Sequence, residues 1–170
     1  EVIHLSTSLR SLLLRIGFVE RLTLEAEEKA AEDARKFAND IASLRKLAET
    51  DPLTNLLNRR AFMEAADDAM RYYQRYGRSI ATLVVDIDHF KKINDSFGHL
   101  AGDAVLKELA LKVRSHSRRE DVFARYGGEE FALMLRESAS EKSIRCAERC
   151  RRAVHGAEFI FNGTPIQVTI

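Results

Sequence analysis

Residues 125–131, Arg-Tyr-Gly-Gly-Glu-Glu-Phe, hold the groups in this chain that are best suited to do chemistry. Two glycines between β-prone runs predict a two-residue hairpin turn, because glycine adopts a positive φ without strain. Glu129 and Glu130 would then open the returning strand and point to opposite faces of the sheet. Bare backbone at Gly128 beside a carboxylate suits the close approach of an anion and its metal ion. The alternative is a solvated hairpin tip with two surface acids.

Asp86 ends the apolar run 80–86 and has no local partner for its charge. If this strand neighbours the hairpin, Asp86, Glu129 and Glu130 would repel one another unless a cation lay between them. Carboxylates without His or Cys favour Mg²⁺ over zinc, and Mn²⁺ could substitute for it. Mg²⁺ completes its shell with water and phosphates, so the expected chemistry is phosphoryl or nucleotidyl transfer with two metal ions. The alternative is that Asp86 is a plain strand-end residue.

The segment 86–103 adds groups suited to a nucleotide. Lys91 is a candidate phosphate ligand, and backbone N–H groups of a turn at 89–90 could cradle phosphates. The Asp103 carboxylate could accept both donors of guanine's base-pairing edge, which adenine does not offer, while Asn94 contacts the base from another side. Two structural alternatives remain open here, namely Asp103 as a helix N-cap and Asn94 in an Asx-turn.

The elements that must position these groups predict an α+β domain. From residue 80 onward their order is βαββαβ, which is the order of an antiparallel-centred sheet with helices on one face. The continuous apolar run 80–86 predicts a central strand covered on both faces. The expected elements are a helix at 59–75 capped by Asn58, a strand at 80–86, a helix at 101–117, hairpin strands at 121–126 and 131–136, a helix ending near 154, and strands at 158–161 and 165–170.

Residues 1–50 predict a long helix, because they contain no proline and are rich in Ala, Leu, Glu, Lys and Arg. Apolar or small residues recur at alternating steps of four and three, which is typical of a coiled-coil seam. We expect a helical stalk at 1–50 that forms a parallel dimer, and a second domain at 51–170; a helix packed on its own domain is the alternative. The seam residues are Leu5, Leu9, Leu12, Ile16, Val19, Thr23, Ala26, Ala30, Ala34, Phe37, Ile41 and Leu44.

The composition argues against several kinds of binding partner and structural site. The chain has 27 Lys and Arg against 26 Asp and Glu, a formal net charge of +1, which argues against a bulk electrostatic grip on nucleic acid. Cys146 and Cys150 lie four residues apart on an expected helix and predict small core residues in a reducing compartment. No apolar run reaches the length of about 18 residues that a membrane span requires. The chain starts without Met and ends on an apolar run, so we expect a piece of a larger protein.

Three motifs, at 51–62, 86–106 and 125–131, resemble those of the GGDEF family of diguanylate cyclases, and the resemblance extends from Asp51 to the end of the chain. It implies a palm-like α+β domain similar to class III nucleotide cyclases. The implied activity is the condensation of two GTP into cyclic di-3′,5′-guanylate (c-di-GMP) and two pyrophosphates, by a dimer with one GTP and Mg²⁺ site in each domain. The family domain continues past the point where this chain stops, so we expect a catalytic domain truncated at its C-terminus.

The resemblance also implies roles for individual residues. Glu129 and Glu130 are the implied catalytic residues, and Glu129 is the one usually assigned to deprotonating the 3′-hydroxyl. The implied metal ligands are Asp86, Glu129 and the carbonyl of Ile87. The implied substrate-binding residues are His89, Phe90 and Lys91 at the triphosphate, Asn94 and Asp103 at guanine, and His99 and Gly128 elsewhere on the nucleotide.

Arg118 and Asp121 form an Arg-x-x-Asp motif that in the family binds the product and inhibits the enzyme, and Arg149 matches a further arginine of that site. Arginine can take guanine's acceptors in a fork while aspartate takes its donors. A surface ion pair is the alternative interpretation of this short motif. For the whole chain, the alternatives to a cyclase are a non-catalytic c-di-GMP receptor and a regulatory dimerisation module. The resemblance implies a bacterial cytoplasmic location, free or as part of a membrane-anchored sensor.

Overall fold

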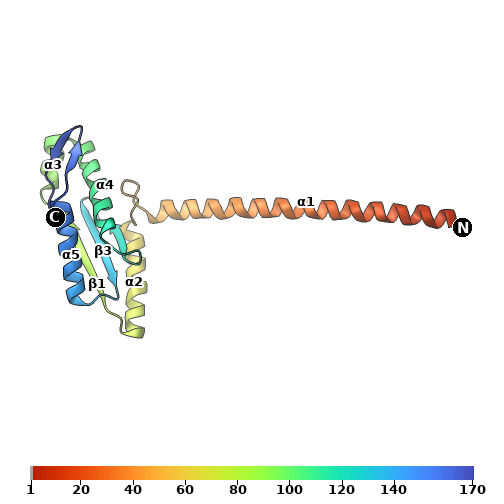
Figure 1. The fold of residues 1–170 in the computed structure, drawn as a ribbon, viewed down its shortest axis with the longest axis horizontal. Coiled ribbons are helices and arrows are strands. Elements are labelled where there is room, and N and C mark those ends of the chain that lie inside the picture. The colour runs from red at the N-terminus through yellow and green to blue at the C-terminus, as the bar shows by residue number, and fades with distance from the viewer. Residues whose placement is uncertain (1) are drawn as a thin grey trace. The chain divides into compact units, whose positions relative to one another are not determined.

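The computed structural model describes the backbone of residues 2–170 and the side chains of residues 15, 18 and 20–170. The chain divides into two compact units, Glu1–Lys46 and Leu47–Ile170. Figure 1 shows the elements. They are α1 (Val2–Glu49), α2 (Arg59–Tyr76), β1 (Ile80–Asp86), α3 (Phe90–Phe97), α4 (His99–Ser115), β2 (Val122–Arg125), β3 (Glu130–Arg136), α5 (Ser140–His155), β4 (Phe159–Phe161) and β5 (Thr164–Ile166).

The first unit is a continuous helix, since α1 runs for 48 residues. In the second half of the predicted seam, Phe37, Ile41 and Leu44 are all exposed. A row of exposed apolar side chains on a helix is typical of a surface that binds a partner. The side chains of the earlier seam residues Leu5, Leu9, Leu12, Ile16 and Val19 lie outside the described residues. No helix in the described part of the chain has both the length and the apolar character needed to cross a bilayer.

Strand β3 is the centre of the second unit. The main sheet is antiparallel with the order β1-β3-β2. The five inner residues of β3 are buried without interruption, as expected for a strand covered on both faces. The prediction that 80–86 would be the doubly covered strand is wrong: β1 lies at the edge of this sheet, and Val84 is 74% exposed. Both strands are apolar, so composition alone does not tell which is central.

The sheet carries helices on both faces, which corrects the expectation of helices on one face. Alternate residues of β3 enter two separate cores, because successive strand side chains point to opposite sides. Leu133 joins α4 and α5 in the larger core, whereas Met134 joins α2 in the smaller one. Figure 1 shows β1 and β3 between α5 and α2. The α+β fold class is therefore confirmed, with an additional layer.

The helical segment before β2 also differs from the prediction. A helix that was not predicted, α3, follows the turn expected at 89–90, and α4 begins at His99 after Gly98, whose φ of +84° favours glycine. Asp103 consequently lies inside α4 and is not its N-cap. At the other end of the chain, β4 and β5 pair with each other in a separate two-stranded sheet and do not extend the main one.

The two cysteines are buried and free, as predicted. Burial raises the pKa of Cys150 to about 11, and the neighbouring Cys146 adds to the shift. The thiol therefore stays protonated near neutral pH, and a protonated thiol is a poor nucleophile and metal ligand.

The central place of β3 leads to a test of stability. We expect Leu133→Ala to lower the free energy of unfolding by about 3 kcal/mol, because it opens a cavity in the larger core. Val84→Ala is the matched control and should change it by less than about 0.5 kcal/mol, since this side chain is mostly solvated. Urea denaturation followed by circular dichroism measures both values. Equal losses would contradict the assignment of β3 as the central strand.

Candidate active site

The glycine loop is longer than predicted. Strand β2 ends at Arg125 and β3 begins at Glu130, so four residues connect them. The backbone N–H groups of Tyr126 and Gly127 both donate to the Glu130 carbonyl, at 2.8 and 3.1 Å. Neither glycine of the loop has a positive φ, so the expected two-residue turn is wrong. Glu129 consequently lies in the loop, and Glu130 is the first residue of the strand.

The two glycines of the loop have different surroundings. A Cβ atom at Gly127 would overlap the carboxylate of Glu130, which lies over the loop. A Cβ atom at Gly128 would meet no atom within 4 Å, so the backbone there is open on its outer side. Gly127 therefore permits a close internal contact, whereas Gly128 leaves space in which a ligand could approach the main chain.

The register of the sheet brings two of the three predicted acidic residues together. Asp86 is the direct partner of Glu130 in the β1–β3 pair. Directly opposite residues of antiparallel strands share a face, with Cβ atoms about 5 Å apart. Both residues are exposed, and Glu129, which precedes Glu130, is half-buried. Like charges placed directly opposite each other destabilise a sheet, so this end of the sheet is suited to a bound cation.

These donors fit Mg²⁺ better than a metal held wholly by protein. Among the described side chains, those of residues 15, 18 and 20–170, no three His, Cys, Asp or Glu form a group that could hold a metal ion by themselves. Mg²⁺ needs only one or two carboxylates and takes its other ligands from water and phosphates. Ile87 can contribute only its main chain, since its side chain is buried. Its carbonyl accepts one long bond from the Phe90 N–H (3.3 Å) and keeps a second lone pair.

The predicted triphosphate residues lie at the start of α3. His89 is exposed and has a φ of +57°, which is unusual for a residue other than glycine. Lys91 is exposed on the first turn of the helix. The ring of Phe90 is buried in the larger core, so any contact of this residue with a ligand would come from its backbone.

The predicted guanine residues lie on two adjoining helices. Asn94 is on α3, and its side chain lies against Gly102 of α4, the residue before Asp103. Both Asn94 and Asp103 are half-buried, so each is partly open to a ligand. His99 is exposed at the first position of α4.

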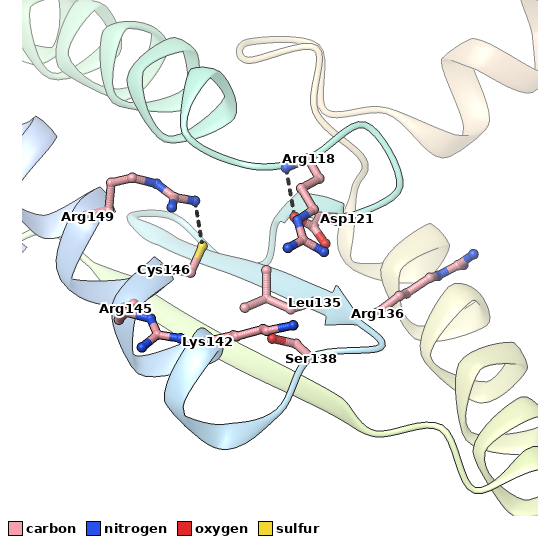
Figure 2. A pocket seen from close by; sticks show the side chains of 9 residues that line it. All are labelled: Arg118, Asp121, Leu135, Arg136, Ser138, Lys142, Arg145, Cys146 and Arg149. Atoms are coloured by element: carbon pink, nitrogen blue, oxygen red, sulfur yellow. Dashed lines mark hydrogen bonds between the residues drawn. The ribbon is translucent and has the colours of Figure 1, made fainter.

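A cavity of about 280 Å³, which we call the product cavity, is lined by the three residues predicted for the product site (Figure 2). The Asp121 carboxylate is buried and accepts the backbone N–H of Arg118 at 2.8 Å. Arg149 donates to the His116 carbonyl, and the Arg118 guanidinium lies 3.9 Å from the carboxylate of Glu120. The complete lining is Arg118, Asp121, Leu135, Arg136, Ser138, Lys142, Arg145, Cys146 and Arg149.

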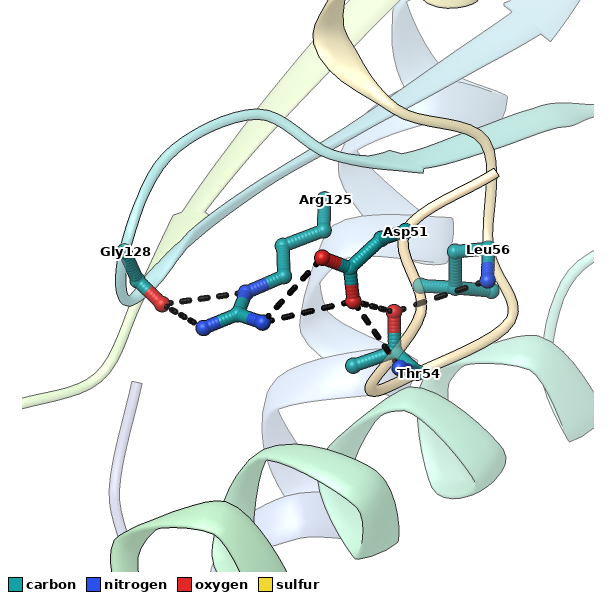
Figure 3. A network of polar contacts seen from close by, with 5 residues as sticks. All are labelled: Asp51, Thr54, Leu56, Arg125 and Gly128. Carbon is teal, nitrogen blue, oxygen red and sulfur yellow. Dashed lines mark hydrogen bonds and ion pairs between the residues drawn. The ribbon is translucent and has the colours of Figure 1, made fainter. Parts of the chain in front are cut away.

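The structure also shows a contact that sequence reasoning missed (Figure 3). Arg125 Nη1 donates to both carboxylate oxygens of Asp51, at 3.2 and 3.3 Å, while its Nε and Nη2 donate to the Gly128 carbonyl at 3.1 and 2.6 Å. Both motifs were noted in the sequence, but the pair is 74 residues apart and no local pattern links the two positions.

The environment of Asp51 keeps this contact ionised. Burial alone would raise the pKa of Asp51, but hydrogen bonds from Thr54 and the charge of Arg125 together lower it below its ordinary value of 3.8. Because folding lowers this pKa, the ionised pair stabilises the fold above pH 3.8. That contribution is lost as the pH falls through the lower pKa of the folded state.

The contact between Asn94 and Gly102 predicts an effect of a small substitution. Gly102→Ala should lower the free energy of unfolding by about 1 to 2 kcal/mol, because the added methyl group displaces the Asn94 side chain and presses on the ring of Phe90. Alanine in a helix would otherwise be stabilising. Gly128→Ala is the matched control and should leave stability nearly unchanged. Chemical denaturation of the two variants checks this, and a stabilised Gly102→Ala would contradict it.

Comparisons with known proteins agree with this arrangement. The family model for the diguanylate cyclase GGDEF domain matches residues 48–170. Diguanylate cyclase DgcP of Pseudomonas aeruginosa is 41% identical over 146 residues, which is 86% of this chain and 22% of DgcP. Response regulator PleD of Caulobacter vibrioides is 43% identical over 121 residues, which is 71% of this chain and 27% of PleD. The chain thus spans about a quarter of the length of these relatives.

One solved structure is similar to this chain over most of the length of both. It contains the coiled coil and GGDEF domain of DgcB from Caulobacter crescentus in complex with c-di-GMP. The TM-score is 0.78 at 31% identity, over 86% of this chain and 78% of the DgcB chain. Sequence motifs, fold and relatives all agree, and the chain belongs to the GGDEF family of diguanylate cyclase domains.

Proposed function

We propose that this chain condenses two molecules of GTP into c-di-GMP and releases two pyrophosphates. The observation that carries the proposal is the register of β1 with β3, which sets Asp86 directly opposite Glu130 beside the open backbone of Gly128. Carboxylates beside exposed main chain, at one end of the sheet, are suited to bind a nucleoside triphosphate and its cations. The relative DgcP is named a diguanylate cyclase, which supports the same activity.

The reaction requires two domains. In each half-reaction the 3′-hydroxyl oxygen of one GTP attacks the α-phosphorus of the other. An O3′–P bond forms, the bond from that phosphorus to the bridging oxygen breaks, and pyrophosphate leaves. A single site holds one nucleotide, so two copies of the domain must face each other. The exposed apolar residues of α1 support a homodimer through this helix, and the DgcB structure is described as containing a coiled coil.

The carboxylates at the sheet end have two tasks. Asp86, Glu129 and the Ile87 carbonyl would hold Mg²⁺, or Mn²⁺ in its place, and Glu130 lies opposite Asp86. The bound ions would neutralise phosphate charge and lower the pKa of the attacking hydroxyl. Glu129 and Glu130 are the catalytic residues. Of the two, Glu129 accepts the proton of the attacking hydroxyl as general base.

Contacts to the rest of the nucleotide come from α3 and α4. The backbone at His89 and Phe90, with the ammonium group of Lys91, binds the triphosphate. Asn94 and Asp103 bind guanine, and their partial exposure leaves polar atoms available to the base. Gly128 and the exposed His99 contact the nucleotide from either side.

The product cavity takes the product. Arg118, Asp121 and Arg149 line one hollow with further basic residues, which suits the phosphates and guanines of c-di-GMP. Product bound there would inhibit the enzyme. The alternative function is a receptor that binds c-di-GMP through the same cavity without turnover. We place either protein in the bacterial cytoplasm, where GTP is available.

Turnover of GTP is the direct test. Purified chain with GTP and Mg²⁺ should form c-di-GMP, detected by chromatography, with a rate per protein that rises with protein concentration as dimers form. Glu129→Gln should reduce the rate at least 100-fold, because it removes a metal ligand and the proton acceptor. The reaction should stop when Mg²⁺ is chelated.

Two further measurements test the guanine site and separate the cyclase from the receptor. Asn94→Ala with Asp103→Ala should lower the preference for GTP over ATP, and equal use of both nucleotides by the unaltered chain would contradict the guanine site. Absence of turnover in a dimeric sample that still binds c-di-GMP would favour the receptor.

The product site predicts a separable effect. Arg118→Ala should weaken inhibition by c-di-GMP at least tenfold, because it removes one charged contact to the ligand, and should leave the initial rate without product unchanged. Arg151→Ala is the matched control, since Arg151 lies on α5 outside the cavity lining. Initial rates at increasing c-di-GMP measure the inhibition constant. An unchanged constant in Arg118→Ala would contradict this site.

A further inference from the structure

Arg125 joins two segments that lie far apart in the sequence. It is the last residue of β2, and its guanidinium lies between the Asp51 carboxylate and the Gly128 carbonyl (Figure 3). The side chains of Arg125 and Asp51 are only 16% and 17% exposed, so their contact is largely shielded from water. A shielded charge-assisted contact of this kind is stronger than a surface ion pair.

Asp51 is itself held in place. It accepts the backbone N–H and the hydroxyl of Thr54, at 2.9 and 2.8 Å. The surrounding segment is tied down by its main chain, since the Asn58 N–H donates to the Glu49 carbonyl and the Arg125 N–H to the Leu57 carbonyl. Asp51 is therefore a fixed anchor, and the guanidinium that it orients is fixed as well.

The Gly128 carbonyl is the other end of the contact. It accepts two N–H groups from Arg125, and it lies one residue before Glu129. At the start of the loop, Tyr126 contacts α2, since the Arg59 guanidinium lies 4.8 Å above its ring and its hydroxyl donates to the Met63 sulfur. Tyr126 therefore holds the beginning of the loop against α2, and the Arg125 contact restrains its middle at Gly128.

We propose that Arg125, oriented by Asp51, is a positioning residue that holds the Gly127–Glu129 loop in the geometry needed for catalysis. The proposal rests on the cyclase function proposed above. Arginine is required because its planar fork donates in two directions at once, whereas the single ammonium group of lysine cannot reach both partners. Asp51 acts on the loop only through Arg125, so its loss should have the smaller effect.

The test compares Arg125→Lys, Asp51→Asn and the double variant in the whole chain. Arg125→Lys should lower kcat about 10- to 100-fold with less than a threefold change in the KM for GTP, because it displaces the catalytic loop rather than the substrate contacts. Asp51→Asn should lower kcat less. The double variant should match Arg125→Lys, because Asp51 has no route to the loop once the guanidinium is gone.

A second readout does not depend on turnover. Hydrogen exchange of the peptide covering 122–131 should be at least tenfold faster in Arg125→Lys and less affected in Asp51→Asn. Arg78→Lys is the matched control. It alters the Arg78–Glu137 ion pair near the opposite end of the β1–β3 pair and should change neither kcat nor exchange in this peptide.

The outcomes distinguish the two proposals. If the unaltered chain forms no c-di-GMP but the exchange pattern holds, the cyclase function fails and the restraint on the loop stands. If turnover is normal and Arg125→Lys changes neither kcat nor loop exchange, the positioning role is wrong. An equal fall in kcat for Arg125→Lys and Val113→Ala, a variant of a buried residue in the last turn of α4, would show a loss of stability alone and would also overturn it.

Discussion

The burial of β3 on both faces is the constraint on which the rest of this domain depends. Its side chains alternate between a core with α4 and α5 and a core with α2, so the strand can neither turn over nor shift by one residue. This fixed strand sets the register of β1, which pairs along its whole length with β3. A one-residue slip would move Asp86 to the opposite face from Glu130, and the two carboxylates would no longer lie together.

The site at the end of these strands is locally unfavourable. Two carboxylates lie directly opposite each other, a third precedes one of them, and His89 adopts a positive φ close by. Such features are tolerated where surrounding structure determines them and a ligand relieves them. The cores on either side of β3 supply that support, and the Arg125 contact adds a restraint on the loop itself.

Much of this arrangement could be predicted from local patterns. Helix α2, with Asn58 as its N-cap and Gly77 after it, follows from short-range capping rules, and strand 80–86 follows from its apolar, β-branched run. The family was predicted from three motifs, and it is confirmed. The pairing of strand 80–86 with the hairpin was also predicted, because the expected order of elements makes these strands neighbours.

What sequence reasoning missed depends on tertiary contacts. Whether β1 or β3 is central is decided by which strand the helices cover, and both are equally apolar. The glycines were expected to serve a tight turn with positive φ, whereas neither has one and the Glu130 side chain lies over Gly127. The Asp51–Arg125 pair has no local signature, because only the folded sheet brings the two residues together.

The most direct measurement of the central claim is the binding of a non-reactive GTP analogue by calorimetry, with and without Mg²⁺. If the facing carboxylates of β1 and β3 form a nucleotide–metal site, binding should be at least tenfold tighter with Mg²⁺. That gain should disappear in Asp86→Asn, while Asp95→Asn, on α3, keeps it. Binding that ignores Mg²⁺, or that gains as much from it in Asp86→Asn, would contradict the account.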